Sequence, residues 1–214
     1  MTIATRLPTP VRQHLAALRA LLVFTVLLGI LYPLAVAAVG QLAFPSQANG
    51  SPVTLNGKIV GSSLLGQAWV DAKGNPLPQW FQSRPSAATD PSNSADPGYN
   101  TGFSAPSNKG PSNTDLIKTI NDRRAAVAAF DGVAPADVPD DAVTASASGL
   151  DPDISPAYAE EQVNRIARAR HLDVGVVRAL VASHTQGRTL GFLGEPRVDV
   201  LGLNVALDKL GGAG

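Results

Sequence analysis

The hydrophobic pattern near the N-terminus is a long run without charges. Residues 20–39 read ALLVFTVLLGILYPLAVAAV, and after Arg19 no charged residue occurs before Lys58. At about 1.5 Å of rise per helical residue, twenty residues span roughly 30 Å, the hydrocarbon thickness of a bilayer. The pattern therefore predicts one transmembrane helix, which we place at 20–44, between an N-terminal segment at 1–19 and one soluble domain at 45–214.

A cleaved signal peptide is the alternative interpretation of this run. Residues 21–34 would be its hydrophobic region, residues 35–37 fit a small-x-small cleavage pattern, and a secreted domain would begin at Ala38. The apolar stretch continues to Phe44, which favours an anchor. Pro33 lies inside the run and removes one backbone hydrogen bond, so it either kinks the helix at a partner contact or marks the outer third of a tilted helix.

The charges before the run are all positive. Residues 1–19 carry Arg6, Arg12, Arg19 and His14 and no carboxylate. Because positive flanks of membrane helices stay in the cytoplasm, we expect the N-terminus inside and the C-terminal domain outside. The sequence thus predicts a single-pass protein of the bacterial inner membrane with an extracytoplasmic domain.

Composition narrows the function of that domain. The rest of the chain holds 14 Lys and Arg against 17 Asp and Glu, a net charge of −3, and the chain has no cysteine. Nucleic-acid binding requires a basic patch and is not expected. Disulfides and cysteine nucleophiles are excluded. The three histidines are scattered, and no Gly-x-x-x-x-Gly-Lys-Ser/Thr loop occurs, so we expect no metal site and no phosphate cradle.

The first half of the domain has strand and loop patterns. Residues 44–52 predict a short linker rich in turn formers, and loose alternation over 57–70 predicts one or two strands. Residues 89–113 are almost entirely small and polar. The aromatic residues Tyr99 and Phe103 favour an ordered loop there, with Ser and Asn side chains bonding the backbone in successive turns.

Helical patterns dominate the second half and predict an α+β domain. A short strand is expected at 143–146. The predicted helices cover 114–130, 157–171 after the N-cap Ser155, a segment from Asp173 to near Gly187, and a last segment from Asp199 to Leu210.

Small hydroxylated residues and one histidine allow a hydrolase hypothesis. Ser146 or Ser148 would be the nucleophile, His184 the base and Asp151 the residue that orients the base. The Gly-x-Ser-x-Gly elbow is absent, which weakens this alternative. The competing interpretation of His184 is a buried or half-buried side chain bonded to a nearby backbone group.

Charged residues late in the chain have two interpretations each. Arg165, Arg168 and Arg170 suit the end of a helix, so we expect a solvated helix end, with a groove for an anionic partner as the alternative. Glu195 and Arg197 are expected either to pair with Arg188 or Asp151 inside the domain or to face a partner.

Several long strings carry a resemblance to a known family. They are GILYPLAVAAVGQLAFPSQANGS at 29–51, WFQSRPSA at 80–87, YNTGFSAPSNKGPSN at 99–113, VTASASGLDPDISPAYAEEQVNRIARAR at 143–170 and HTQGRTLGFLGEPRVDVLGLNVALD at 184–208. With these strings the chain resembles the C subunits of the Kdp-type potassium-transporting ATPase of bacteria and archaea. Ser83, Ala147, Asp153 and Asp199 depart from the residues usual in that family.

The resemblance implies an accessory subunit of an ATP-driven high-affinity potassium uptake pump, one that stabilises or assembles the complex and has no catalytic activity of its own. Its implied partners are a channel-like potassium-translocating subunit, a P-type ATPase subunit, a small membrane peptide and membrane lipid. ATP, Mg and potassium would be used on those other subunits, in keeping with the absence of an Asp-Lys-Thr-Gly-Thr motif here. Family members are also described as raising nucleotide affinity, but an external domain without a phosphate cradle argues against direct nucleotide binding.

The resemblance and the polar character of its motifs also select residues for the domain framework or the partner surface. These residues are Pro33, Arg84, Ser86, Tyr99, Asn100, Ser107, Asn108, Ser112, Asn113, Thr144, Ser146, Ser148, Asp151, Gln162, His184, Thr185, Arg188, Glu195 and Arg197.

Overall fold

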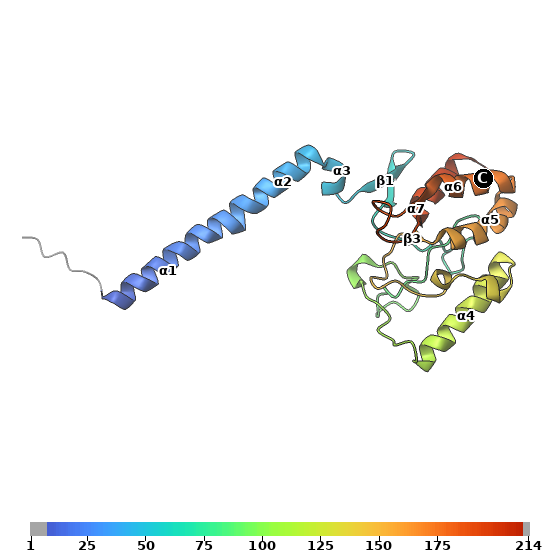
Figure 1. Cartoon of the computed structure of the whole chain (residues 1–214), viewed down its shortest axis with the longest axis horizontal. Helices are drawn as coiled ribbons and strands as arrows, with labels where there is room; N and C mark the ends of the chain where they lie inside the picture. The colour runs from blue at the N-terminus through green and yellow to red at the C-terminus, as the bar shows by residue number, and fades with distance from the viewer. Residues whose placement is uncertain (1–7, 212–214) are drawn as a thin grey trace, which may run out of the picture. The chain divides into compact units, whose positions relative to one another are not determined.

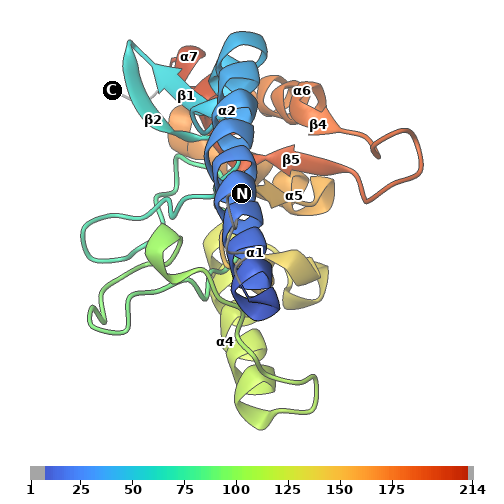
Figure 2. The same ribbon diagram turned by 90° about the vertical axis from the view of Figure 1, so that its left-hand side faces the viewer.

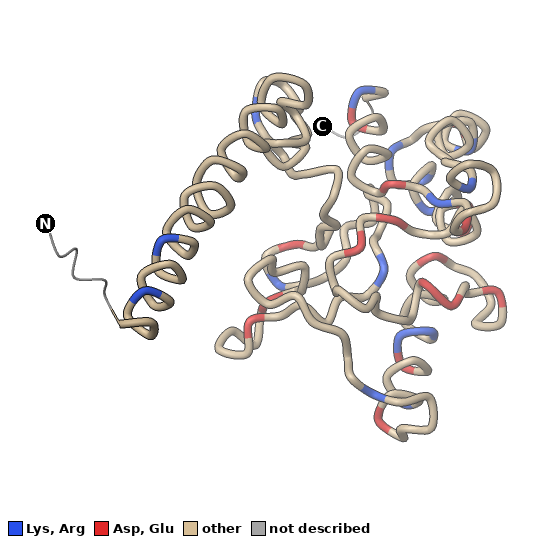
Figure 3. Tube along the Cα trace, turned by 60° about the vertical axis from the view of Figure 1, so that its left-hand side comes forward, with Lys and Arg blue, Asp and Glu red and all other residues tan. Residues whose placement is uncertain are grey.

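The computed structural model describes residues 8–211 and forms two units that divide between Ser51 and Pro52 (Figure 1). The first unit is dominated by one continuous helix made of α1 (Thr9–Val26), the π-helical turn η1 (Leu27–Leu31) and α2 (Tyr32–Ala43). Among the described residues, this is the one helix long and apolar enough to cross a membrane. It begins at Thr9, well before the predicted span, and carries its basic residues in its first half (Figure 3).

The π turn accounts for how the helix accommodates Pro33. In a regular α-helix, the proline ring collides with the carbonyl four residues earlier and removes one hydrogen bond. The Tyr32 N–H here bonds the Leu27 carbonyl, five residues back. The wider turn absorbs the proline without ending the helix.

The segment after the helix is more ordered than the predicted linker. It contains the single-turn helix α3 (Pro45–Ala48). The Asn49 side chain donates to the Pro45 carbonyl at 2.6 Å and exchanges hydrogen bonds with Gln41.

The second unit opens with the antiparallel hairpin of β1 (Pro52–Leu55) and β2 (Lys58–Ser62). Asn56 and Gly57 both have positive φ, 50° and 75°, as the two-residue turn of a twisted hairpin requires. The predicted strand region of 57–70 therefore contains β2, whereas β1 lies before it.

A second small antiparallel sheet has the strand order β3-β5-β4, with β3 at Asp153–Ile154, β4 at Thr185–Gln186 and β5 at Arg197–Asp199. The strand predicted at 143–146 is wrong. The chain there follows the 3-10 turn η4 (Asp140–Ala142) into irregular turns. Side chains replace a strand partner, because Arg123 donates to the Val143 carbonyl and Arg84 to the Thr144 carbonyl.

The predicted helices are confirmed. They are α4 (Thr114–Asp131), α5 (Pro156–Arg170), α6 (Val174–His184) and α7 (Val200–Lys209), with the shorter 3-10 turns η2 (Thr101–Phe103) and η3 (Pro135–Asp137) between other elements. Ser155, Asp173 and Asp199 each accept a backbone N–H at the helix start, as expected. Helix α6 ends at His184 rather than near Gly187, because the chain enters β4 at Thr185.

The core lies where α5, α6 and α7 pack beside the β3-β5-β4 sheet (Figure 2). Its fully buried members include Phe81, Val143, Ile166 and Leu203. The second unit is thus one α+β domain, and its core fixes the polar segments described next.

Candidate functional site

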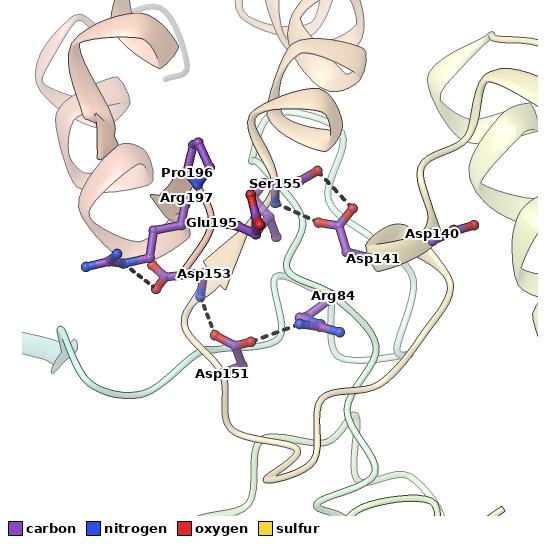
Figure 4. A pocket seen from close by; sticks show the side chains of 10 residues that line it. Arg84, Asp140, Asp141, Asp151, Asp153, Ser155, Glu195, Pro196 and Arg197 are labelled. Atoms are coloured by element: carbon purple, nitrogen blue, oxygen red, sulfur yellow. Dashed lines mark hydrogen bonds and ion pairs between the residues drawn. The ribbon is translucent and has the colours of Figure 1, made fainter. Parts of the chain in front are cut away.

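An acidic cavity of about 460 Å³ lies beside β3 and β5 (Figure 4). Four parts of the chain line it: Arg84, Asp140 and Asp141 of η4, Asp151 with Asp153 to Ser155 around β3, and Glu195 to Arg197 leading into β5. Five of these residues are carboxylates and two are arginines. The cavity therefore gathers several of the residues selected from the sequence.

Arg84 connects two of these segments. Its Nη1 donates to Asp151 Oδ2 at 2.9 Å, and its Nε and Nη2 lie 3.4 Å from the Thr144 carbonyl. The other Asp151 oxygen accepts from the Asp153 N–H at 3.0 Å. Asp151 thus pairs with Arg84 and not with Arg197, and this contact holds the loop before β3 in place.

Arg197 instead pairs with Asp153, with 3.2 Å between Nε and Oδ2. Burial raises the pKa of Asp153, the nearby charge of Asp151 raises it further, and Arg197 lowers it. The two residues stand near each other because Asp153 and Ile154 of β3 are in register with Asp199 and Val198 of β5.

Asp141 fixes the start of α5. Its two carboxylate oxygens accept from the Ser155 N–H at 2.6 Å and the Ser155 hydroxyl at 2.9 Å. The same hydroxyl accepts from the Tyr158 N–H at 3.0 Å, as a helix N-cap does. The carboxylate therefore orients the cap.

The remaining two carboxylates of the cavity are also paired. Asp140 bonds Arg124 at 3.2 Å, and the predicted Glu195 pair with Arg188 is present at 2.6 Å. Within residues 8–211, no group of three or more metal-ligating side chains is arranged to hold a metal ion. Each carboxylate of the cavity thus bonds another part of the protein. These side chains are suited to holding the loops in place and to presenting a polar surface.

The loop at 89–113 is ordered in the way the sequence predicted. Asp90, Asn93, Asp96 and Asn100 each accept the N–H two residues ahead, which makes four successive side-chain turns. Asn100 also donates to Asp96 at 3.0 Å. The repeated Asp and Asn residues therefore supply the hydrogen bonds that regular secondary structure would otherwise provide.

Ser86 and Tyr99 fasten this loop to the rest of the domain. The Ser86 hydroxyl donates to the Gly149 carbonyl at 2.6 Å and accepts from the Tyr99 N–H at 2.8 Å. Burial raises the pKa of Tyr99 to about 12, so its phenol stays protonated and donates to the Arg84 carbonyl at 2.7 Å. Gly149 has a φ of 67°, and a Cβ there would lie 2.7 Å from the Ala88 nitrogen, so the contact requires glycine.

Other residues that the sequence motifs assigned to the framework or the partner surface make local contacts or lie exposed. Asn113 accepts from the Leu116 N–H and caps α4, and the Thr185 hydroxyl donates to the Val181 carbonyl. Ser107, Asn108 and Ser112 are exposed. Their motif had placed these three residues with the framework or the partner surface, and their exposure is consistent with a place on the surface.

The proposed catalytic residues are engaged elsewhere. His184 Nδ1 lies 3.0 Å from the Leu180 carbonyl, which confirms the half-buried, backbone-bonded interpretation. Asp151 is held by Arg84, and the Ser146 hydroxyl lies 3.4 Å from the Ser148 hydroxyl. These contacts provide no nucleophile–base–orienter relay, so the hydrolase alternative has no support.

The prediction of a solvated helix end is wrong for two of the three arginines. Arg165 and Arg170 are 4% and 1% exposed, whereas Arg168 is exposed. Arg165 stacks over Phe130 and Arg170 over Trp80, with 4.5 Å and 4.1 Å to the ring centroids. Their partners lie far away in sequence, so the helix pattern alone could not reveal them.

Two buried side-chain amides hold the segment at 81–82 as a strand neighbour would. Asn204 of α7 accepts from the Phe81 N–H at 2.9 Å and donates to its carbonyl at 3.0 Å. Gln162 of α5 does the same for Gln82, at 2.6 Å and 3.2 Å. Gln162 lies in one of the family-like motifs and was selected, whereas the only signal for Asn204 in the sequence is a polar residue inside an apolar helix face.

Comparison with known proteins agrees with the sequence motifs. Residues 14–209 match the family model described as KdpC: K+-transporting ATPase, c chain. Proteins called potassium-transporting ATPase KdpC subunit are similar over nearly the whole chain. The relative from Streptomyces avermitilis is 52% identical over 206 residues, covering 91% of this chain and 92% of its own length. The relative from Kineococcus radiotolerans is 55% identical over 196 residues, covering 92% and 93%. With the apolar helix, the α+β domain and these matches in place, we conclude that the chain belongs to the KdpC family, the c chains of K+-transporting ATPases.

Proposed function

We propose that the protein is a membrane-anchored accessory subunit of a K+-transporting ATPase and has no catalytic activity of its own. The observation that carries this proposal is the family match over residues 14–209, which includes most of the candidate membrane helix as well as the domain. The cavity residues support it, because Asp151 and Asp153 pair with the two cavity arginines, Asp141 holds the Ser155 cap, and Asp140 and Glu195 pair with arginines nearby.

The name of the relatives calls them subunits of a potassium-transporting ATPase, and the resemblance of the sequence motifs suggests which partners this chain would have. We assign ATP hydrolysis and potassium translocation to other subunits of the complex, namely a P-type ATPase subunit and a channel-like subunit, with a small membrane peptide completing it. The framework residues Arg84, Ser86, Tyr99, Asp151 and Gln162 would act indirectly, by fixing the shape of the domain that meets these subunits.

Co-purification tests the proposal directly. With a C-terminal tag and mild detergent, we expect the chain to recover a P-type ATPase and a large multi-span subunit in stoichiometric amounts. Deleting the chain should abolish the potassium-dependent ATPase activity of the complex. Recovery of the chain alone, or unchanged activity after its deletion, would contradict the proposal.

We also propose that the N-terminus is cytoplasmic and that the domain from residue 45 is extracytoplasmic. The support is the pair Arg12 and Arg19 in the first half of the helix and the absence of acids there (Figure 3).

Because the chain has no cysteine, this orientation can be tested with single cysteines. In intact spheroplasts, a membrane-impermeant maleimide should label Asn108→Cys, which is exposed in the domain, and should spare Gln13→Cys in α1 until the membrane is opened. The reverse labelling pattern would show that the domain is inside.

A further inference from the structure

A second cavity, of about 380 Å³, is lined by α4, by the first turn of α5 and by the segment at 82–85. Its volume falls within the roughly 300–1,000 Å³ of small-molecule sites, which are mostly apolar and carry a few polar groups. The apolar part of its wall consists of Pro76, Pro85, Ala126, Val127, Phe130 and Ala142. The polar side chains in the wall are Gln82, Ser83, Arg123 and Tyr158. These four decide what kind of ligand the cavity suits.

Tyr158 brings an unused hydroxyl to this cavity. The residue is 3% exposed, and among residues 8–211 nothing bonds its hydroxyl, although buried hydroxyls almost always have a partner. Its oxygen is not sealed inside the protein, in contrast to the unbonded Trp69 Nε1 and Glu161 oxygens, so it opens toward the cavity. Burial raises the pKa of Tyr158. The phenol therefore stays protonated and can donate a hydrogen bond to a ligand.

Arg123 of α4 brings a positive charge without a counter-ion. It is half-buried, burial lowers the pKa of its guanidinium, and no carboxylate in the described part of the chain pairs with it. Its Nη1 donates to the Val143 carbonyl at 3.2 Å, and its other N–H groups have no acceptor among the described residues. A guanidinium stays charged and binds a carboxylate through two parallel hydrogen bonds. Arg123 therefore favours an anion in the cavity.

The other two polar side chains of the wall have already used their donors. The Gln82 side-chain amide donates to the carbonyls of Leu77 and Trp80 at 3.0 Å and 3.3 Å. The Ser83 hydroxyl donates to the Gln67 carbonyl at 2.8 Å. The donors left for a ligand are thus the guanidinium and the phenol described above, and the hydrogen bonds of their neighbours hold the wall in a fixed shape.

We propose that this cavity binds a small organic monocarboxylate with an apolar body. The carboxylate would accept from the Arg123 guanidinium and the Tyr158 hydroxyl, and the body would lie against the apolar residues of the wall. A single uncompensated cation balances one negative charge, which favours a monocarboxylate over a doubly charged phosphate. The charge of Asp131, which also acts on Tyr158, is neutralised by its pair with Arg165 and does not oppose the anion. This inference does not depend on the proposed function.

Equilibrium dialysis of phenylacetate against the full chain in nanodiscs of neutral lipid, with the signal of empty nanodiscs subtracted, tests the site. We expect one phenylacetate bound for each chain, with a dissociation constant below about 1 mM, which a ligand of this size reaches at an ordinary efficiency per atom. Phenylacetamide has the same shape without the charge and should bind at least about tenfold more weakly. Equal affinity for the acid and the amide, or no saturable binding of phenylacetate, would overturn the proposal.

Two variants locate the binding. Tyr158→Phe removes only a hydroxyl that has no partner among the described residues, so the unfolding temperature should not fall, while the affinity for phenylacetate should fall at least about threefold. Arg123→Gln should lower that affinity at least about tenfold and abolish the preference for the acid over the amide. The control is Lys118→Gln, an exposed cation earlier in α4 that pairs with Asp122, and it should change neither. Unchanged affinity in Tyr158→Phe, or an equal loss in the control, would show that phenylacetate binds elsewhere and would overturn the proposal.

Discussion

Replacing Arg165 by methionine is expected to lower the free energy of unfolding by about 3–5 kcal/mol. The buried guanidinium donates to Asp131 at 2.5 Å, to Gln162 at 2.6 Å and to the carbonyls of Pro78 and Trp80 at 2.5 Å and 3.0 Å. Methionine fills a similar volume but satisfies none of these acceptors. It leaves Asp131, which is 3% exposed, as a buried charge without its partner.

Denaturant unfolding of the full chain in detergent measures this loss. Tryptophan fluorescence is a suitable signal, because the Trp69 and Trp80 rings lie 5.2 Å apart and Trp80 bonds Arg165 directly. The matched control is Arg168→Met on the exposed face of the same helix, which should change stability by less than about 0.5 kcal/mol. A loss below about 1 kcal/mol for Arg165→Met, or an equal loss for the control, would contradict the assignment.

The helices could be predicted because their signals are local. Ser155, Asp173 and Asp199 cap helices through N–H groups two or three residues away, and periodic apolar residues follow each cap. The ordered loop was predictable for the same reason, since its Asp and Asn side chains bond N–H groups two residues ahead.

The buried arginines could not be predicted because their partners are distant in sequence. Arg165 and Arg170 reach carbonyls of Pro78 and Gln79, 87 and 91 residues earlier. Arg170 lies in the last turn of α5, where a cation is also favourable in water, so the local sequence there is equally consistent with exposure. Only the fold, which brings the 78–82 segment against α5, decides between the two.

In the candidate site, too, the residues could be predicted from the sequence but their contacts could not. Sequence motifs selected Arg84, Asp151 and Arg197, and the structure places all three at one cavity. The choice of partner was not predictable. Arg197 takes Asp153 and not Asp151, because the β3–β5 register and the position of Arg84 assign each carboxylate to a different arginine.

A carboxyl group in the same polar network makes the stability of the domain depend on pH. Both Glu161 oxygens are buried, and no donor among the described residues reaches them. Asp131 adjoins Glu161, and two carboxyls can share a hydrogen bond only when one of them is protonated. Burial raises the pKa of Glu161 from 4.5 to about 7, and the charges of Asp131, Asp141 and Asp137 from α4, η4 and η3 add to the effect.

The raised pKa sets the direction of the pH dependence. Below about pH 4.5, the folded and unfolded chains both hold the Glu161 proton, so the group does not affect stability. Between pH 4.5 and about 7, the unfolded chain loses this proton while the folded chain keeps it, so the domain becomes less stable as the pH rises. Above about pH 7 the folded chain has also lost the proton, and the decrease in the free energy of unfolding is complete. The full pKa difference would correspond to about 3 kcal/mol, and because Glu161 is only half-buried, we discount the penalty to about 1–2 kcal/mol.

Glu161→Gln is therefore expected to stabilise the chain by about 1–2 kcal/mol near pH 8 and to leave its stability unchanged near pH 4.5. The neutral amide carries no charge to desolvate and can donate to Asp131 at every pH. Unfolding of the full chain in detergent, repeated across this pH range, measures the effect. The control is Glu160→Gln on the exposed side of the same helix, which gives up only a surface pair with Arg178 and should keep the pH profile of the unmodified chain. A stabilisation of Glu161→Gln that is the same at both ends of the range would show that Glu161 is not the titrating group.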